Sequence, residues 1–215
     1  MRIKRILDIS GVINDKTTIW PGDEGVTLNR IQKIEDGDSC NLSTLHIGIH
    51  TSTHIDAPLH FIAGGVDVSS ANLDKFIGFA KVFYISTEKC IKASDLSGLD
   101  IQSGDIVLFK TSNSSLDMTG SFNTGFVYLD ESAASWLVDK DVATVGIDYL
   151  SVEDYYAGNA VTHKLLLKKG IGIIEGLRLD DVPEGEYFLS CVPLKIEGAE
   201  GSPVRAVLVE FDKEI

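Results

Sequence analysis

The apolar residues of this chain fall into short runs rich in Val and Ile, and none approaches the roughly 18 residues of a membrane-spanning helix. Short runs of this kind, bounded by polar residues and glycines, are typical of β-strands. The runs that predict strands are Ile3–Ile9, Val26–Ile34, Leu42–Ile49, Ala80–Ser86, Asp105–Lys110, Val142–Ile147, Ile171–Ile174, Tyr187–Val192 and Val204–Phe211.

Helical spacing interrupts these strands in two places. Asp130–Lys140 begins with acidic residues and ends with Lys, and Thr162–Lys169 is followed by Gly170, a common C-terminal stop. We expect shorter helical turns at Leu73–Phe79 and Ser151–Tyr156. No repeat, linker or shift in composition divides the 215 residues. The sequence therefore predicts one α/β domain over residues 1–215, with a mixed sheet and flanking helices.

The overall charge limits the possible partners. With 19 Lys and Arg against 32 Asp and Glu, the net charge of −13 disfavours nucleic acid and anionic membrane surfaces. The N-terminus does not resemble a signal peptide. Three widely spaced cysteines without a C-x-x-C motif are typical of reduced thiols, so we expect a cytoplasmic protein whose cysteines are buried.

Four of the five histidines lie between His46 and His60. In an extended chain alternate side chains point to opposite faces, so residue parity predicts two different faces here. The odd positions from Leu45 to Ile55 are apolar or Thr, whereas the even ones include His46, His50, His54, Asp56 and His60. This pattern predicts a strand that runs into a turn at Pro58, with imidazoles and a carboxylate on one face.

A helix is the alternative geometry, because His50 and His54 are four residues apart, as in some zinc sites. At about 100° per residue, however, Asp56 would lie nearly opposite His54 on such a helix. The β-branched residues between Thr51 and Ile55, together with Pro58, also disfavour a helix.

The spacing H-x-x-x-H-x-D predicts a metal site made by His50, His54 and Asp56. Imidazole nitrogens and a carboxylate suit Zn²⁺ or Mn²⁺, and the sequence does not choose between them. Three protein ligands leave a coordination position open for water. His46 lies further along the strand, where a supporting or structural role is expected.

The run from His50 to His60, H-T-S-T-H-I-D-A-P-L-H, resembles the H-x-G-T-H-x-D-x-P-x-H signature of the metal-dependent cyclase hydrolases. This family includes bacterial kynurenine formamidases and isatin hydrolases. The resemblance extends over nearly the whole chain, in the segments Trp20-Pro21-Gly22-Asp23, Ser103–Leu108, Val145–Asp148, Thr162–Leu166, Ile174–Leu177 and Gly201–Ala206.

The resemblance implies a swivelling β/β/α type of fold and a binuclear centre, with one or two divalent ions per chain. By this carry-over His50 and His54 hold the first ion, His163 and Glu175 hold the second, and Asp56 bridges them. His60 is then the general acid/base. The resemblance also implies a homodimer or homotetramer acting on a small molecule, with Trp20 lining the substrate pocket.

One position departs from the signature, because Ser52 stands where the family has Gly. By parity Ser52 lies on the ligand face between the two histidines. We therefore expect its hydroxyl to contact the substrate or to narrow the pocket.

These features together predict a hydrolase that cleaves an amide-type C–N bond, most closely that of an arylformamide such as N-formyl-kynurenine. One alternative is the same chemistry on a cyclic amide or an ester. A second is a metal-binding family member without turnover, in which Ser52 occludes the site. A third is a plain binding module, which predicts that no metal binds.

Overall fold

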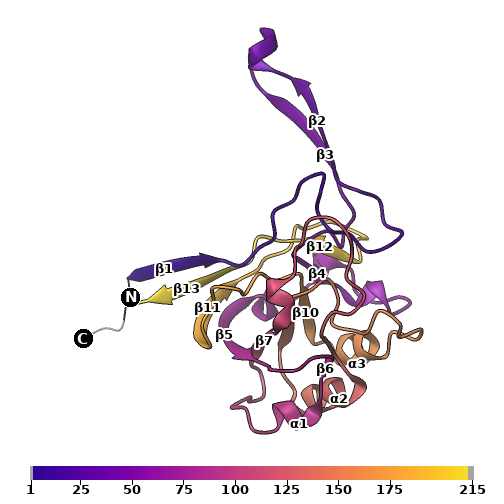
Figure 1. The fold of residues 1–215 in the computed structure, drawn as a ribbon, viewed down its shortest axis with the longest axis vertical. Coiled ribbons are helices and arrows are strands. Elements are labelled where there is room, and N and C mark those ends of the chain that lie inside the picture. The colour runs from indigo at the N-terminus through magenta and orange to yellow at the C-terminus, as the bar shows by residue number, and fades with distance from the viewer. Residues whose placement is uncertain (1, 213–215) are drawn as a thin grey trace.

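The computed structural model of the chain describes residues 2–212 and contains one large mixed sheet (Figure 1). The strands are β1 (Ile3–Asp8), β2 (Thr27–Gln32), β3 (Leu42–His46), β4 (His54–Asp56), β5 (Ile77–Tyr84), β6 (Cys90–Ile91), β7 (Ile106–Lys110), β8 (Tyr128–Leu129), β9 (Thr144–Ile147), β10 (Gly172–Glu175), β11 (Gly185–Ser190), β12 (Gly201–Pro203) and β13 (Val207–Phe211). The α-helices are α1 (Ala93–Leu96), α2 (Glu131–Lys140) and α3 (Val161–Lys169).

Nine of the strands form the main sheet, in the order β1-β13-β11-β5-β7-β9-β10-β4-β12. The strands β5, β7, β9 and β10 are parallel to one another, whereas β11 pairs with β5, and β4 with β10 and β12, in antiparallel fashion. The carboxyl ends of parallel strands lie at one edge of a sheet, where α/β folds bind their ligands. The predicted α/β class with a mixed sheet is confirmed.

The central strands separate two apolar cores. In β7, Val107 and Phe109 pack with the helices, while Ile106 and Leu108 face the opposite core. This alternation is what a strand buried on both faces requires. Helices α2 and α3 pack against each other on the face of the sheet that carries Val107 and Phe109. As the sequence predicts, Asp130 caps the N-terminus of α2 and Gly170 caps the C-terminus of α3.

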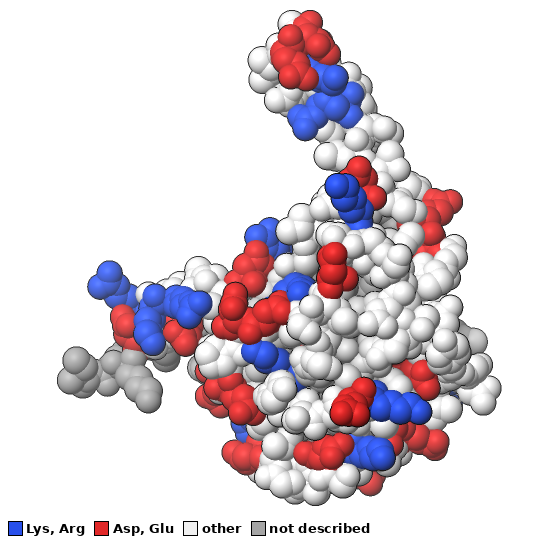
Figure 2. All heavy atoms as spheres, in the orientation of Figure 1, with Lys and Arg blue, Asp and Glu red and all other residues white. Residues whose placement is uncertain are grey.

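Strands β2 and β3 pair only with each other and project from the body as an arm, which we define as residues 27–46 (Figure 1). Large apolar side chains on the arm are exposed, including Leu28 at 62% and Leu45 at 54%. Its charged side chains gather at the tip, and most of its stem is uncharged in Figure 2. An isolated two-stranded hairpin is only marginally stable in water. Within the described part of the single chain, nothing packs on the exposed apolar side chains of the arm.

Several sequence predictions are wrong in detail. The strand expected to continue through residues 47–53 is instead a turn, and Ser151–Tyr156 forms a loop. The helical turn expected near Leu73–Phe79 is present as a 3₁₀ helix over Leu73–Lys75, and it is shorter than the expected range because β5 already begins at Ile77. Cys40 is exposed on the arm, whereas the other two cysteines are buried.

The short elements β6, β8, β12 and α1 were not predicted, because two to four residues carry too little periodicity to recognise. The domain limits of 1–215 stay a prediction at both ends, since residues 1 and 213–215 lie outside the described range. Within residues 2–212, no helix is both long and apolar enough to cross a membrane.

Candidate metal centre

Strand β4 carries two predicted ligands and places one of them directly opposite a third. In its antiparallel pairing with β10, His54 lies opposite Glu175, and Asp56 lies opposite Ile173. His54 and Asp56 share one face of β4, while Ile55 between them is fully buried in the apolar core. The alternation predicted from residue parity therefore holds within β4.

A sharp turn precedes β4 and separates His50 from it. Ser52 has a φ of 60°, in the left-handed region that favours glycine. The backbone of Gly176 approaches the carbonyl group of Ser52 so closely that a Cβ there would overlap it. The family's Gly at position 52 thus matches a backbone requirement.

The prediction that the Ser52 side chain faces the substrate is corrected by this turn. Its hydroxyl lies against Gly11, where a Cβ would overlap it, and Ser52 is not among the residues that line the cavity. Its contribution to the centre comes from the backbone, because its carbonyl oxygen lies 2.9 Å from His54 Nδ1. With Nδ1 donating this hydrogen bond, Nε2 of His54 is left to face the other ligands.

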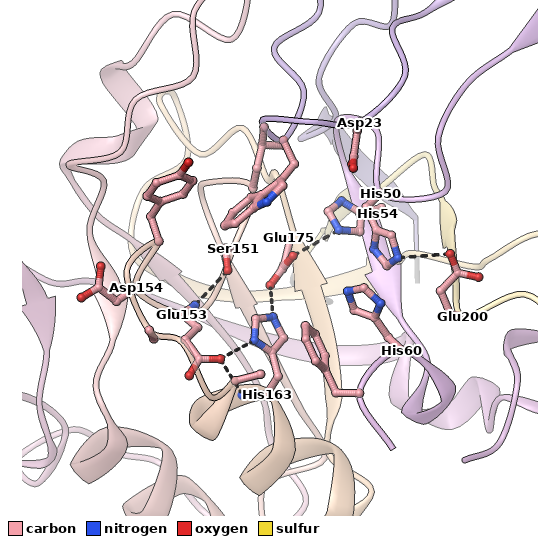
Figure 3. A pocket seen from close by; sticks show the side chains of 16 residues that line it. Asp23, His50, His54, His60, Ser151, Glu153, Asp154, His163, Glu175 and Glu200 are labelled. Atoms are coloured by element: carbon pink, nitrogen blue, oxygen red, sulfur yellow. Dashed lines mark hydrogen bonds and ion pairs between the residues drawn. The ribbon is translucent and has the colours of Figure 1, made fainter. Parts of the chain in front are cut away.

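Two sets of three potential ligands meet at Asp56. Figure 3 shows the other four residues of these sets, His50, His54, His163 and Glu175. In the first set, Asp56 Oδ1 lies 2.9 Å from His50 Nδ1 and 3.6 Å from His54 Nε2. In the second set, His163 Nε2 lies 3.2 Å from Glu175 Oε1 and 3.6 Å from Asp56 Oδ2. The five residues come together as the binuclear prediction requires, and their role as ligands remains a prediction.

Unpartnered buried atoms test whether these residues fit a metal. Within residues 2–212, no hydrogen bond of good geometry reaches the buried His50 Nε2, His54 Nε2 or either carboxylate oxygen of Asp56, although Asp56 Oδ1 lies 2.9 Å from His50 Nδ1 and His54 Nε2 lies 3.1 Å from Glu175 Oε2. Leaving such groups unsatisfied is costly, and a divalent cation would satisfy the carboxylate and a ring nitrogen at once. Two or three imidazoles with carboxylates are a donor set that suits Zn²⁺ or Mn²⁺. The residues fit the ion that the sequence predicts.

The electrostatics of the site also favour a cation. Burial opposes charge on His163, but the Glu153 and Glu175 carboxylates outweigh it and raise the pKa of His163 to about 10. The pKa of His54 is likewise raised, because Glu175 and Asp56 outweigh its burial. Burial raises the pKa of Asp56, yet the neighbouring His50 and His54 lower it well below the usual range. Protons on the imidazoles therefore balance carboxylates that a metal would otherwise neutralise.

His60 lies at the end of a 3₁₀ helix (Pro58–His60), which begins at the proline that the sequence identified as a turn. Its ring stacks on His50 with a centroid distance of 4.0 Å. Burial and the nearby His50 lower the pKa of His60, although Asp56 opposes them. A neutral imidazole beside the ligands, itself outside both ligand sets, is suited to accept a proton.

A cavity of about 420 Å³ opens above these residues. Trp20 forms part of its wall and contacts Tyr155 and Phe122 at centroid distances of 5.3 and 5.0 Å. The lining residues are Trp20, Asp23, His50, His54, His60, Phe61, Leu150, Ser151, Glu153, Asp154, Tyr155, Ala157, Ala160, His163, Glu175 and Glu200. The site therefore has room for a small molecule between an aromatic wall and the ligand sets.

One histidine lies away from the centre, and two acidic residues beside the centre are not predicted by the sequence. His46 lies on the arm, exposed, and pairs with Glu24 rather than with the centre. Glu153 and Glu200, which lie 2.7 Å from His163 Nδ1 and 3.7 Å from His50 Nε2, were missed. Isolated acidic residues are common on surfaces, and nothing in the sequence distinguishes these two.

Comparisons with known proteins agree with this geometry. The family model described as putative cyclase matches residues 7–154. A kynurenine formamidase from Salinibacter ruber is 37% identical over 205 residues, covering 94% of this chain and 96% of that protein. Both findings span the histidine-rich segment and the ligands of the first set.

Solved structures show the same fold. A potential metal-dependent hydrolase with cyclase activity matches with a TM-score of 0.87 and 36% identity, covering 97% of this chain and 99% of the other. An isatin hydrolase bound to the product analogue thioisatinate matches with a TM-score of 0.83 at 22% identity, covering 95% and 92%. At that identity the second likeness shows the fold alone. The resemblance seen in the sequence is thus confirmed, and the chain belongs to the cyclase family.

Proposed function

We propose that this protein is a metal-dependent hydrolase that cleaves the amide C–N bond of a small arylformamide such as N-formyl-kynurenine. The observation that carries the proposal is the meeting of two ligand sets at Asp56, beside a cavity lined by the other four residues of these sets and by His60. The 37% identical relative is named a kynurenine formamidase, and the 36% identical structure is described as a potential metal-dependent hydrolase. Both names support the same reaction class.

The ligand residues define where the reaction takes place. His50, His54 and Asp56 would hold one divalent ion, and His163 and Glu175 with Asp56 would hold a second. When bound, such an ion polarises a carbonyl oxygen and lowers the pKa of water to about 7. Glu175 Oε1 also accepts a hydrogen bond of 2.7 Å from the Val152 amide, which helps to hold the carboxylate in place.

His60 supplies the proton transfers in this proposal. Because its pKa is lowered, its ring is neutral at pH 7 and can take a proton from the attacking water. The same nitrogen then returns the proton to the departing aryl nitrogen as the C–N bond breaks. The products are formate and the free arylamine, so the atoms of substrate and water are all accounted for.

Trp20 orients the substrate in this proposal. Its indole lies in the cavity wall with Tyr155 and Phe122 behind it. An aromatic ring of the substrate can stack on this surface, which would place the formyl group over the ligands.

The decisive test is turnover by metal-stripped protein reloaded with Zn²⁺ or Mn²⁺, measured on N-formyl arylamines, isatins and lactones. We expect formate release from the N-formyl arylamines. Preferential opening of isatins or lactones would instead assign the cyclic substrates. Stoichiometric metal without turnover on any of them would identify a binding protein, and no metal uptake would contradict the whole proposal.

Two variants examine the second ion. His163→Ala and Glu175→Ala each remove one ligand of the second set and none of the first three residues. We expect metal content to fall by one ion per chain, while the first site stays occupied. Metal content equal to that of the parent would show that the centre is mononuclear.

We further propose that the protein is a homodimer or homotetramer of the cytoplasm. The exposed apolar side chains of the arm support self-association, because a second copy of the chain is a partner always present at equal concentration. Three free cysteines support a reducing compartment.

A further inference from the structure

Glu153 belongs to neither ligand set, yet it lies beside them and is only 5% exposed. Its Oε2 lies 2.7 Å from Nδ1 of His163 (Figure 3), and its Oε1 accepts a hydrogen bond of 3.0 Å from the Thr162 amide. Burying a carboxylate is costly unless it is paired and hydrogen-bonded. This one is held entirely by residues at the beginning of α3.

Helix α3 needs such an acceptor, because its own N-cap supplies none. Ala160 has a φ of 49° and makes no side-chain capping bond. Glu153 takes the place of a cap at the Thr162 amide, and its other oxygen lies 3.5 Å from the His163 amide. A carboxylate at this end also complements the helix dipole. The start of α3 and the ring of His163 are therefore fixed by the same side chain.

The contact with Glu153 decides which ring nitrogen of His163 faces the centre. With Nδ1 donating to Glu153, Nε2 is the nitrogen that points at Glu175 and Asp56, 3.2 and 3.6 Å away, and a bound ion would take the place of its proton. A carboxylate behind a histidine ligand fixes the tautomer and the ring orientation and raises the basicity of the ligand nitrogen. His54 has a neutral counterpart, the Ser52 carbonyl oxygen.

The same contacts reach the wall of the cavity. Glu175, the partner of His163, accepts a hydrogen bond of 2.7 Å from the Val152 amide. Residues 151–160 contribute Ser151, Asp154 and Tyr155 to the cavity, and Tyr155 touches Trp20. This segment is thus fastened to the second ligand set at Val152 and again at Glu153.

We infer that Glu153 is the positioning residue of the second half-site, and that it couples occupation of that half-site to the shape of the wall formed by residues 151–160. The inference rests on the proposed binuclear centre. It predicts that the wall is better ordered when the second ion is bound, and that the coupling depends on the Glu153 carboxylate.

The test is Glu153→Gln, with Asp154→Asn as a matched control. Gln offers one acceptor oxygen, so it can serve either the His163 ring or the Thr162 amide but not both. Asp154→Asn removes the same charge from the next residue, which lines the cavity and bonds to the Tyr156 amide and to Tyr128 but to no residue of the ligand sets. Metal-stripped protein is titrated with Zn²⁺ and with Mn²⁺, and amide hydrogen exchange is followed over residues 151–160.

For Glu153→Gln we expect the second ion to bind about 10–100-fold more weakly and the first as in the parent. Exchange over 151–160 should be faster than in the parent at one set metal concentration. The KM of an N-formyl arylamine should rise for the same reason. Asp154→Asn should retain both ions, and Glu153→Asp, which keeps the charge on a shorter side chain, should fall between parent and Gln.

If Glu153 only stabilised the fold, its replacement would lower stability without changing metal binding. Asp130→Ala removes the cap of α2, 2.9 Å from the Ala133 amide, and should lower the melting temperature without changing metal uptake. If Glu153→Gln behaves like Asp130→Ala and binds both ions as the parent does, the inference is wrong. If the parent itself takes up no second ion, the binuclear centre fails and the inference fails with it.

Discussion

Ser52 shows how a backbone requirement can look like a substrate contact in the sequence. Its φ of 60° places it in a conformation that costs an L-residue roughly 1–2 kcal/mol more than glycine. Its hydroxyl packs against Gly11 instead of the cavity. The exchange of the family's Gly for Ser in this chain therefore changes the energy of the backbone conformation and leaves the lining of the pocket unchanged.

The first prediction follows from that conformation. Ser52→Gly should leave KM for the substrate unchanged and should stabilise the protein by up to about 1 kcal/mol, because relief of strain exceeds the added freedom of the unfolded chain. Ser52→Ala is the control, since it keeps the Cβ and should give no gain. A several-fold change of KM in Ser52→Gly would instead show that the Ser52 side chain contacts the substrate.

His60 can be separated from the ligands by a paired measurement. Metal content and kcat are measured on one preparation of His60→Ala, which should keep its metal and lose on the order of 10²–10⁴ in kcat, the usual contribution of a general acid/base. His50→Ala, whose ring stacks on His60, should lose metal and activity together. Loss of metal in His60→Ala would make this residue a ligand.

At the scale of elements, a buried carboxylate ties the end of β9 to the segment after β7. Asp148 follows β9 directly and accepts four hydrogen bonds, two from Thr111 and two from Ser114, with lengths of 2.6–3.0 Å. The next residue, Tyr149, accepts a hydrogen bond from Gly176 at 2.7 Å, immediately after the ligand Glu175. Asp148 thus supports the sheet edge on which the centre is built.

Asp148→Asn should destabilise the protein by about 2–4 kcal/mol, because the amide NH₂ cannot accept and leaves buried donors without partners. The measurement is the free energy of unfolding in urea. Asp117→Asn is the matched control, since Asp117 makes a similar pair of bonds to Thr119 at the surface and should change little. Equal effects of the two substitutions would contradict a special role for the buried network.

The elements also show what the sequence could predict. Long strands, α2, α3 and the alternation around His54 were recognisable because each carries a period of its own. The first ligand set was recognisable because its members lie within seven residues, from His50 to Asp56. Residues 47–53 were misjudged because parity assumes an extended chain, and Ser52 breaks it. Glu153 was invisible because its partner, His163, is brought to it only by the fold.

At the scale of the whole molecule, the arm is the feature that a single chain does not explain. Leu28 and Leu45 lie opposite each other on one face of the β2–β3 hairpin, and Asn29 and Thr44 form the next pair. Successive pairs point to opposite faces of a hairpin, so Leu28 and Leu45 lie on the face opposite to Asn29 and Thr44. A second copy of the chain would cover Leu28 and Leu45.

Replacing both Leu28 and Leu45 with Ser should reduce the oligomer to its 23.3 kDa chains, as measured by light scattering after size exclusion. The circular dichroism spectrum should be retained, because the arm contributes to neither core of the main sheet. Asn29→Ser with Thr44→Ser changes the opposite face and should leave the mass as it is. A parent that already elutes as a single chain would refute self-association.

The position of β4 in the sheet determines when the centre can exist during synthesis. β4 lies between β10 and β12, and Thr53 at its start hydrogen-bonds to Gly176, 123 residues further along the chain. At roughly 5–20 residues per second, a ribosome adds that stretch about 6–25 seconds after the histidine-rich segment has been made. Until then the three first ligands have no strand to pair with and no Glu175 beside them. In the proposed centre, uptake of metal is thus a late event in the life of each molecule, because it waits until β10 has been made and has paired with β4.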